Sequence, residues 1–336
     1  MRIAALQGAV QAYNALMITI YRTDETTNAL TQLEEIQPGC WVSVVAPTAE
    51  DRGWLEGALN IEPEFITAMF DDEERSHVDY DEDSRHTLVI LDCPCVEDKD
   101  DKVAADTTQY DTHPLSALFL PEHQVIVTVA LQENATVTYF QAGRSRELKT
   151  QQRTQMLLLM MLHVSQSYQT NLRIIDRQFK KNEQKLRASM RNLEMIRMLG
   201  LEKSLIYFSI SLRAMEATLA KIGAGKYIKM FEEDKDLLDD VRIEFRQASE
   251  MCEISSKLLN ETMDTFSNII NNSMNDAMKR LTIITLVLAV PTIVFSFYGM
   301  NVDNLPFIDS WVWAMLISLV LCISAGIIFV KCRFFR

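Results

Sequence analysis

Hydrophobic residues are concentrated in two long segments near the end of the chain. The first extends from Leu281 to Met300 and the second from Trp311 to Val330, and neither contains a charged side chain. A helix needs about 20 consecutive apolar residues to cross the hydrocarbon core of a bilayer. The pattern therefore predicts two membrane-spanning helices, and taken alone it is equally compatible with a simple hairpin anchor.

Basic residues flank these segments but are missing from the loop that joins them, Asn301 to Ser310. The flanking basic residues are Lys279, Arg280, Lys331, Arg333 and Arg336. Because short loops rich in Lys and Arg remain on the cytoplasmic side, both termini are predicted to be cytoplasmic. We therefore expect a multi-pass protein of a cell inner membrane or plasma membrane, with Trp311 and Trp313 at its outer interface.

Residues 1–145 have a different pattern, in which short β-branched or apolar runs are separated by turn residues. The runs that predict strands are Met17 to Tyr21, Trp41 to Val45, Leu88 to Leu91, Ala117 to Leu120 and Val125 to Val129. Pro121 to Gln124 predicts the turn of a hairpin, and residues 47–59 and 62–70 predict helices. The sequence thus predicts an N-terminal cytoplasmic α/β domain.

Long helices are predicted to follow this domain. Residues 146–233 contain little Gly or Pro and predict a helical hairpin that turns near Gly200. A further helix is predicted over residues 234–297, where the stalk continues directly into the first membrane segment. At ~1.5 Å per residue it would be about 96 Å long. One small domain cannot bury such a helix, so it needs partners of its own kind.

One face of the 234–297 helix is polar or small along most of its length. At 3.6 residues per turn, these positions lie within about a quarter turn of one line. They are Asn260, Asp264, Asn268, Asn271, Asn275, Met278, Leu281, Thr285, Ala289, Thr292 and Ser296. Small residues in a membrane helix also permit tight helix packing. The cytoplasmic run of Asn and Asp favours a water-filled axis instead.

Composition limits the function classes further. The formal net charge is −13 and 24% of the residues are charged. Nucleic acid is an unsuitable partner, because binding it requires a basic surface. The six cysteines and five histidines lack the spacing of a zinc cage. Phosphate-binding loops and catalytic motifs are also missing, so the chain is not predicted to be an enzyme.

The tetrapeptide Tyr298-Gly299-Met300-Asn301 closes the first membrane segment. At these residues the chain resembles the CorA family of divalent-cation channels, part of the two-TM-GxN superfamily. The resemblance implies an α+β cytoplasmic domain, long stalk helices and two C-terminal transmembrane helices in a homopentameric funnel. Residues 298–310 are then the extracytoplasmic loop, 311–330 the second transmembrane helix and 331–336 a basic cytoplasmic tail.

The expected ion pathway runs along the polar face. Mg²⁺ releases its water reluctantly, so we expect a ring of Asn301 amides, with the Gly299 and Met300 carbonyls, to select the hydrated ion. Met278 and Leu281 are predicted to form apolar rings that close the pore by dewetting. The remaining pore-lining residues are predicted to be Asn271, Asn275, Thr285, Ala289, Thr292 and Ser296.

This chain departs from the family pattern at Thr285, where Ala is frequent, and at Ala289, where a bulky Met often narrows the pore. We therefore expect a wider and more polar mid-pore.

Regulation in the family depends on Mg²⁺ bridging carboxylates of neighbouring cytoplasmic domains. Asp240 and Asp264 match two of these positions, but Ala68 stands where the family usually has an acid. Either Asp71 or Asp72, one turn later, takes its place, or the channel senses Mg²⁺ weakly. Basic residues near the helical-hairpin turn suit either anionic lipid headgroups or a solvated surface.

The predicted function is influx of Mg²⁺, and possible co-substrates are Co²⁺ and Ni²⁺. Mg²⁺ is both the transported ion and the regulatory ion, and the partners are four further copies of the chain and the bilayer. The alternatives are a ZntB-like Zn²⁺ transporter, with the same architecture, and a membrane-anchored sensor or scaffold that does not conduct.

Overall fold

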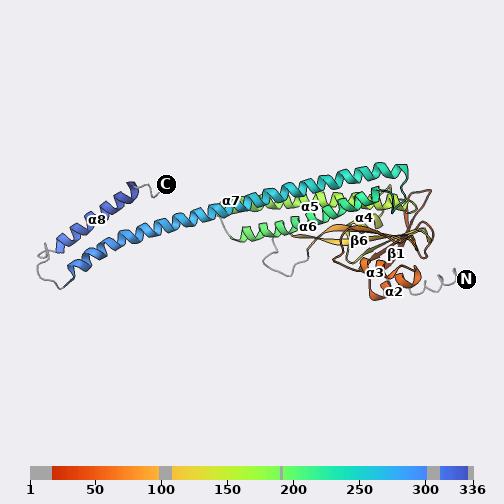
Figure 1. Ribbon diagram of the computed structural model, residues 1–336, viewed down its shortest axis with the longest axis horizontal. Helices are drawn as coiled ribbons and strands as arrows, with labels where there is room; N and C mark the ends of the chain where they lie inside the picture. Colours follow the sequence, from red (N-terminus) through yellow and green to blue (C-terminus); the bar gives the residue numbers. More distant parts are fainter. Residues whose placement is uncertain (1–16, 98–107, 190–191, 301–310, 332–336) are drawn as a thin grey trace. The chain divides into compact units, whose positions relative to one another are not determined.

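Figure 1 shows the computed structural model of the chain, which describes residues 17–97, 108–189, 192–300 and 311–331. The chain divides into two compact units, residues 1–261 and residues 262–336. The strands are β1 (Ile18–Thr23), β2 (Leu30–Leu33), β3 (Trp41–Val45), β4 (His77–Tyr80), β5 (Thr87–Val96), β6 (Tyr110–Leu120) and β7 (Val125–Ala130). The helices are α2 (Ala49–Ala58), α3 (Pro63–Met69), α4 (Ala135–Gln141), α5 (Arg153–Ser189), α6 (Asn192–Gly223), α7 (Glu232–Tyr298) and α8 (Trp311–Lys331).

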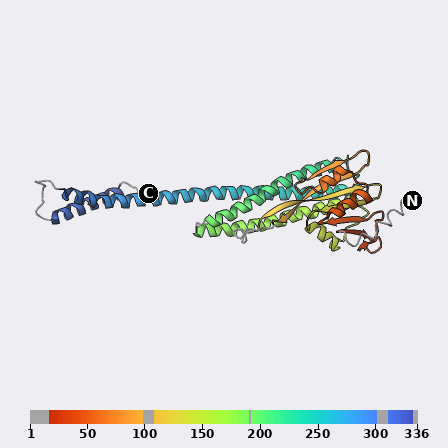
Figure 2. The same cartoon turned by 90° about the horizontal axis from the view of Figure 1, so that it is seen from below.

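The first unit is built on a seven-stranded sheet in the order β2-β1-β3-β7-β6-β5-β4. Only the central pair, β3 and β7, is parallel, and the other neighbours are antiparallel. Helices α2 and α3 cover one face, while α5 and α6 lie side by side over the other (Figures 1 and 2). Strand β7 is buried at every position. This two-sided cover explains its continuous apolar run.

All five predicted strands and both predicted short helices of this domain are confirmed. Pro63 lies in the first turn of α3, where a missing N–H costs no hydrogen bond. Three elements were not predicted, namely β2, β4 and α4. Strands β2 and β4 have four residues each and contain polar residues, so their sequences carry too little periodicity to predict a strand.

A buried polar network joins the sheet to α5 and α6. The Ser211 hydroxyl donates to Asp92 Oδ2 at 2.6 Å, and the Tyr168 hydroxyl donates to the Asp92 carbonyl oxygen at 3.0 Å. Burial raises the pKa of the Asp92 carboxyl above its ordinary value. Because these three residues come from β5, α5 and α6, the network fixes the register of the hairpin on the sheet.

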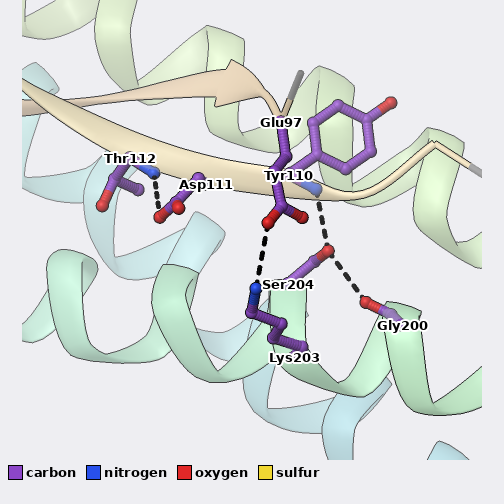
Figure 3. Close-up of polar contacts among 7 residues, drawn as sticks. All are labelled: Glu97, Tyr110, Asp111, Thr112, Gly200, Lys203 and Ser204. Atoms are coloured by element: carbon purple, nitrogen blue, oxygen red, sulfur yellow. Dashed lines mark hydrogen bonds and ion pairs between the residues drawn. The ribbon is translucent and has the colours of Figure 1, made fainter. Parts of the chain in front are cut away.

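A second set of contacts holds α6 against the other end of β5 and β6, as Figure 3 shows. Lys203 Nζ lies 3.0 Å from Glu97 Oε1, and the Tyr110 N–H donates to Ser204 Oγ at 2.8 Å. The Ser204 hydroxyl in turn donates to the Gly200 carbonyl oxygen at 3.1 Å. Glu97, from an acidic run otherwise typical of a solvated surface, therefore has a structural partner.

The hairpin turn is not near Gly200, so that prediction was wrong. Helix α5 ends at Ser189 and α6 begins at Asn192, which leaves Gly200 inside α6. A Cβ added at Gly200 would lie 2.1 Å from Gln109 Nε2. Gly200 thus lies inside a helix, beside the end of the Gln109 side chain that precedes β6, and not in a turn.

The start of α7 packs on the hairpin within the first unit. Val241, Phe245, Ala248 and Cys252 recur at helical spacing and are all buried. The Cys252 thiol lies 3.3 Å from the Leu205 carbonyl oxygen of α6. One face of this part of α7 is therefore held by its own chain.

Candidate functional site

Helix α7 continues without interruption for 67 residues to Tyr298, so the spacing assumed for the polar face applies. Within the second unit this face is open. Asn271, Asn275, Met278, Leu281, Thr285, Thr292 and Ser296 are exposed, and Ala289 is half-buried. Seven of the eight predicted lining residues are thus exposed, as are many residues on the other faces of α7, and their role in conduction stays a prediction.

The opposite face of α7 is the one that α8 contacts. Val287 and Val294 lie about 180° and 160° from Met278 at 100° per residue. Val294 is buried, and the Cys322 thiol of α8 lies 3.6 Å from the Val287 carbonyl oxygen. On α8, Ala314 and Ser318 are buried at the same helical spacing as Cys322. Small residues of this kind allow two helices to approach closely.

Pro291 explains why the Val287 carbonyl is available. Proline has no backbone N–H, so the carbonyl four residues earlier loses its helical donor. That carbonyl belongs to Val287, and the Cys322 thiol takes the place of the missing N–H donor. This pair was not predicted from the sequence, although a proline inside an apolar helix is a visible signal. An unsatisfied carbonyl is costly in a bilayer, so this contact helps to fix α8 on α7.

Two threonines of the open face bond to their own helix. The Thr285 hydroxyl donates to the Leu281 carbonyl oxygen at 2.8 Å, and the Thr292 hydroxyl donates to the Leu288 carbonyl oxygen at 3.1 Å. Each hydroxyl therefore donates its proton within α7, and the lone pairs of its oxygen are left to accept hydrogen bonds from a ligand on the open side. Such oxygens are suited to accept hydrogen bonds from the waters of a hydrated cation.

The apolar pair Met278 and Leu281 lies on the same face. Their exposed fractions are 61% and 65%, which is unusual for large hydrophobic side chains in a packed protein. Lys279 and Arg280 lie beside Met278 in the sequence. Lys279 Nζ lies 3.6 Å from Asp276 Oδ1, so Asp276 partly neutralises the charge of this basic pair. The exposure fits residues that meet copies of themselves or a membrane.

Helix α7 ends at Tyr298, immediately before the glycine of the tetrapeptide. The Gly299 N–H donates to the Phe295 carbonyl oxygen at 2.9 Å, and a Cβ at Gly299 would lie 3.1 Å from that oxygen. Met300 is exposed. Tyr298 packs edge-to-face on Phe297 with ring centroids 5.7 Å apart, which agrees with a packing role. Asn301 and the rest of the 301–310 loop lie outside the described residues.

The predicted regulatory carboxylates are dispersed. Asp72 Oδ1 lies 3.0 Å from His113 Nδ1, and Asp71 accepts the Glu73 N–H at 2.9 Å. Asp240 and Asp264 are exposed. Among the described residues, no group of three or more His, Cys, Asp or Glu side chains is arranged to hold a metal ion. The regulatory role of these carboxylates stays a prediction.

Ala68 is partly buried and packs against the hydrophobic core beneath α3. A carboxylate at position 68 would have to turn away from this apolar core to reach solvent. Asp71 and Asp72, in contrast, are exposed beyond the end of α3. The exposed pair is thus better placed for an ion than residue 68 itself.

Three basic residues near the hairpin turn have carboxylate partners on their own helix. Lys180 Nζ lies 2.7 Å from Asp176 Oδ2, and Arg187 Nη2 lies 2.7 Å from Glu183 Oε1. Arg197 Nη1 lies 3.4 Å from Glu194 Oε1. This pairing favours a solvated charged surface over a lipid-binding patch.

In the described part of the chain, α7 contains one stretch that is long and apolar enough to cross a membrane, judged by length and composition. Val312–Ile327 of α8 is a shorter apolar stretch.

Comparison with known proteins gives a consistent result. Residues 37–333 match the family described as CorA-like Mg²⁺ transporter protein. The chain is 26% identical over 268 residues to the cobalt/magnesium transport protein CorA of Methanocaldococcus jannaschii, covering 79% of this chain and 81% of that protein.

Two solved structures share the fold. The complete CorA magnesium transporter of M. jannaschii superposes with a TM-score of 0.73 at 21% identity, covering 94% of this chain and 96% of that one. The ZntB cytoplasmic domain of Vibrio parahaemolyticus superposes with a TM-score of 0.59 at 12% identity, covering 76% and 99%.

Proposed function

Because the chain belongs to the CorA family of Mg²⁺ transporter proteins, we propose that it is a homopentameric channel for divalent-cation influx, with Mg²⁺ as its main substrate. Five α7 helices surround the axis and α8 lies outside them. Both helices cross the membrane, and both termini are cytoplasmic. The observation that carries the proposal is the open polar face of α7, opposite the face that α8 contacts.

Selection of the hydrated cation is assigned to the residues at the C-terminal end of α7. Mg²⁺ keeps its waters, so neutral oxygens that bind the hydrated ion retain it without trapping it. We assign this task to the Asn301 amides with the Gly299 and Met300 carbonyls. Farther along the axis, the Thr292 and Thr285 oxygens accept hydrogen bonds from the moving waters. Such an outer-sphere pathway also admits Co²⁺ and Ni²⁺.

Closure is assigned to Met278 and Leu281. Five copies of two large apolar side chains, one helical turn apart, form a narrow stretch from which water withdraws. Their high exposure in the single chain supports this assignment, because the assembled rings would bury them. Widening the ring admits water and opens the path.

Regulation by cytoplasmic Mg²⁺ is assigned to Asp240 and Asp264 on α7 and to Asp71 or Asp72 on a neighbouring subunit. Bound Mg²⁺ neutralises these carboxylates and holds the subunits in the closed arrangement. When internal Mg²⁺ falls, their repulsion loosens that arrangement.

The test is growth rescue of a bacterial strain that lacks Mg²⁺ uptake. The unmodified chain is expected to restore growth at low Mg²⁺, and Asn301→Ala is expected to fail at equal membrane expression. Asn304→Ala is the matched control, because it removes the same amide outside the tetrapeptide. Rescue by Asn301→Ala would refute the filter assignment. Failure of the unmodified chain, with Zn²⁺ flux but no Mg²⁺ flux in proteoliposomes, would favour a ZntB-like transporter.

A further inference from the structure

The side chain of His86 is buried at the end of the β4–β5 turn. Only 3% of the residue is exposed, and its Nδ1 atom is shielded from solvent without a hydrogen-bond partner in the described chain. Buried polar groups normally have a partner, because leaving one unsatisfied costs free energy. The channel function proposed above does not use this residue.

The surroundings of His86 suit only the neutral imidazole. With its proton on Nε2, the neutral ring leaves the buried Nδ1 as an unused acceptor. Protonation would place a second N–H at Nδ1, where the described chain offers no acceptor, and it would also bury a charge. Burial accordingly lowers the pKa of His86 below its ordinary value.

Charged groups from three segments act on His86, and they act in opposite directions. Burial has the largest effect on its pKa and disfavours protonation. Glu122 in the β6–β7 turn, Glu62 before α3 and Asp81 in the β4–β5 turn favour the protonated ring, whereas His123 opposes it. Because Glu62 and Glu122 are exposed, a protonated ring would be attracted out of the core toward solvent.

The backbone of His86 closes the β4–β5 turn. The Asp81 N–H donates to the His86 carbonyl oxygen at 3.1 Å, and the His86 N–H donates to Ser84 Oγ at 3.2 Å. Between Ser84 and His86, Arg85 is exposed and has a φ of 57°, in the left-handed region that residues other than glycine adopt rarely. The turn thus keeps an uncommon conformation while the His86 ring is packed beside it.

The residue after His86 connects this turn to the segment that leads into α7. The Thr87 hydroxyl donates to the Tyr227 carbonyl oxygen at 3.0 Å, and the rings of Tyr80 and Tyr227 have centroids 6.2 Å apart. Helix α7 begins shortly afterwards, at Glu232. A displaced β4–β5 turn would therefore loosen the contacts that hold the segment before α7 against the sheet.

We propose that His86 is a pH-sensitive latch between the sheet and the segment that leads into α7. The neutral ring lies in the core and keeps the β4–β5 turn closed. The protonated ring moves out toward Glu62 and Glu122, and the turn and the segment before α7 loosen. In the loosened state His86 is exposed and titrates near about pH 6.5. The latch is thus closed above this pH and opens as the pH falls below it, because the loosened state then binds a proton that the closed state does not.

The test is hydrogen–deuterium exchange of the full-length chain in detergent at about pH 7.5 and about pH 5.5, corrected for the intrinsic pH dependence of exchange. Protection of backbone amides is compared in residues 77–90, which contain the turn, and in residues 225–236, which lead into α7. Both segments are expected to lose protection at the lower pH, by up to about tenfold, the limit set by a histidine that titrates near about pH 6.5. Strand β3 is expected to change less.

His86→Gln has no titrating ring and is expected to abolish the difference between the two pH values in both segments. His123→Gln is the matched control, because it removes a half-buried histidine of the neighbouring β6–β7 turn and should keep the difference. Should His86→Gln fail to fold by circular dichroism, His86→Leu takes its place with the same expected result, because an apolar side chain suits the buried position.

The proposal is overturned if the unmodified chain keeps the same protection at both pH values or if the variant without His86 keeps the difference. It is also overturned if β3 loses as much protection as the turn, which would show a global loss of stability and not a local opening. Because exchange is measured without transport, the result does not depend on the channel proposal.

Discussion

Ala289→Met tests the ion pathway at its middle. At 100° and ~1.5 Å per residue, Ala289 lies about 20° from the line through Met278 and Ser296 and about 16 Å along the helix from Met278. Methionine extends three heavy atoms farther than alanine, about 4 Å. Five such side chains would form a second apolar ring between the filter and the gate. We expect Mg²⁺ influx to fall at least tenfold, a barrier increase of about 1.4 kcal/mol.

The assay is the initial rate of Mg²⁺ entry into proteoliposomes that contain a Mg²⁺-sensitive dye, at equal amounts of reconstituted protein. Ile284→Met is the matched control, because Ile284 is exposed about 120° away from Met278 around α7. It should conduct normally. Equal or faster influx through Ala289→Met would show that residue 289 does not face the ion, and the assignment of the open face would fail.

Three further predictions concern closure, sensing and stability. Leu281→Asn makes the apolar ring wettable, so patch-clamp recordings should show current persisting at internal Mg²⁺ that closes the unmodified channel; normal closure would exclude Leu281 from the gate. Asp240→Asn and Asp72→Asn should each shift inhibition of uptake to higher internal Mg²⁺, and unchanged inhibition in both would leave neither as a sensor. Burial raises the pKa of Asp92, so the folded state keeps this proton longer than the unfolded chain, and stability falls as pH rises from about 4. Asp92→Asn should remove that slope in unfolding midpoints measured between pH 4 and 7, and an unchanged slope would count against it.

The predictable part of the fold is the part where periodicity is strong. Buried strands such as β3 and β7 are mainly apolar runs with turn residues on either side. The long apolar stretch of α7 is typical of a helix that satisfies its own backbone hydrogen bonds. Prediction failed where a residue has a tertiary role. Gly200 suggests a turn in the sequence, yet it lies inside α6, beside the side chain of Gln109, which precedes β6.

The candidate site was predictable to a similar degree. The polar face of α7 follows from helical spacing alone, and most of its residues are exposed in the chain, but their role as a pore lining stays a prediction. The partner of Asp72 was not predictable, because His113 comes from β6, an element distant in sequence.

The contact between α8 and α7 bears on the main alternative to an ion pathway. Small residues on a membrane helix are often explained by tight packing against a neighbour, and α8 is the neighbour closest in sequence. However, α8 contacts α7 at Val287, where Pro291 has freed a carbonyl oxygen that Cys322 approaches. This site lies about half a turn from Thr285, Ala289, Thr292 and Ser296. Packing against α8 therefore cannot account for the small and polar residues of the open face. In the proposed assembly, their partner is either another copy of α7 or the water between several copies. An interface between two copies would explain the small side chains, but polar oxygens repeated over both the apolar and the Asn-rich parts of the helix are better explained by water.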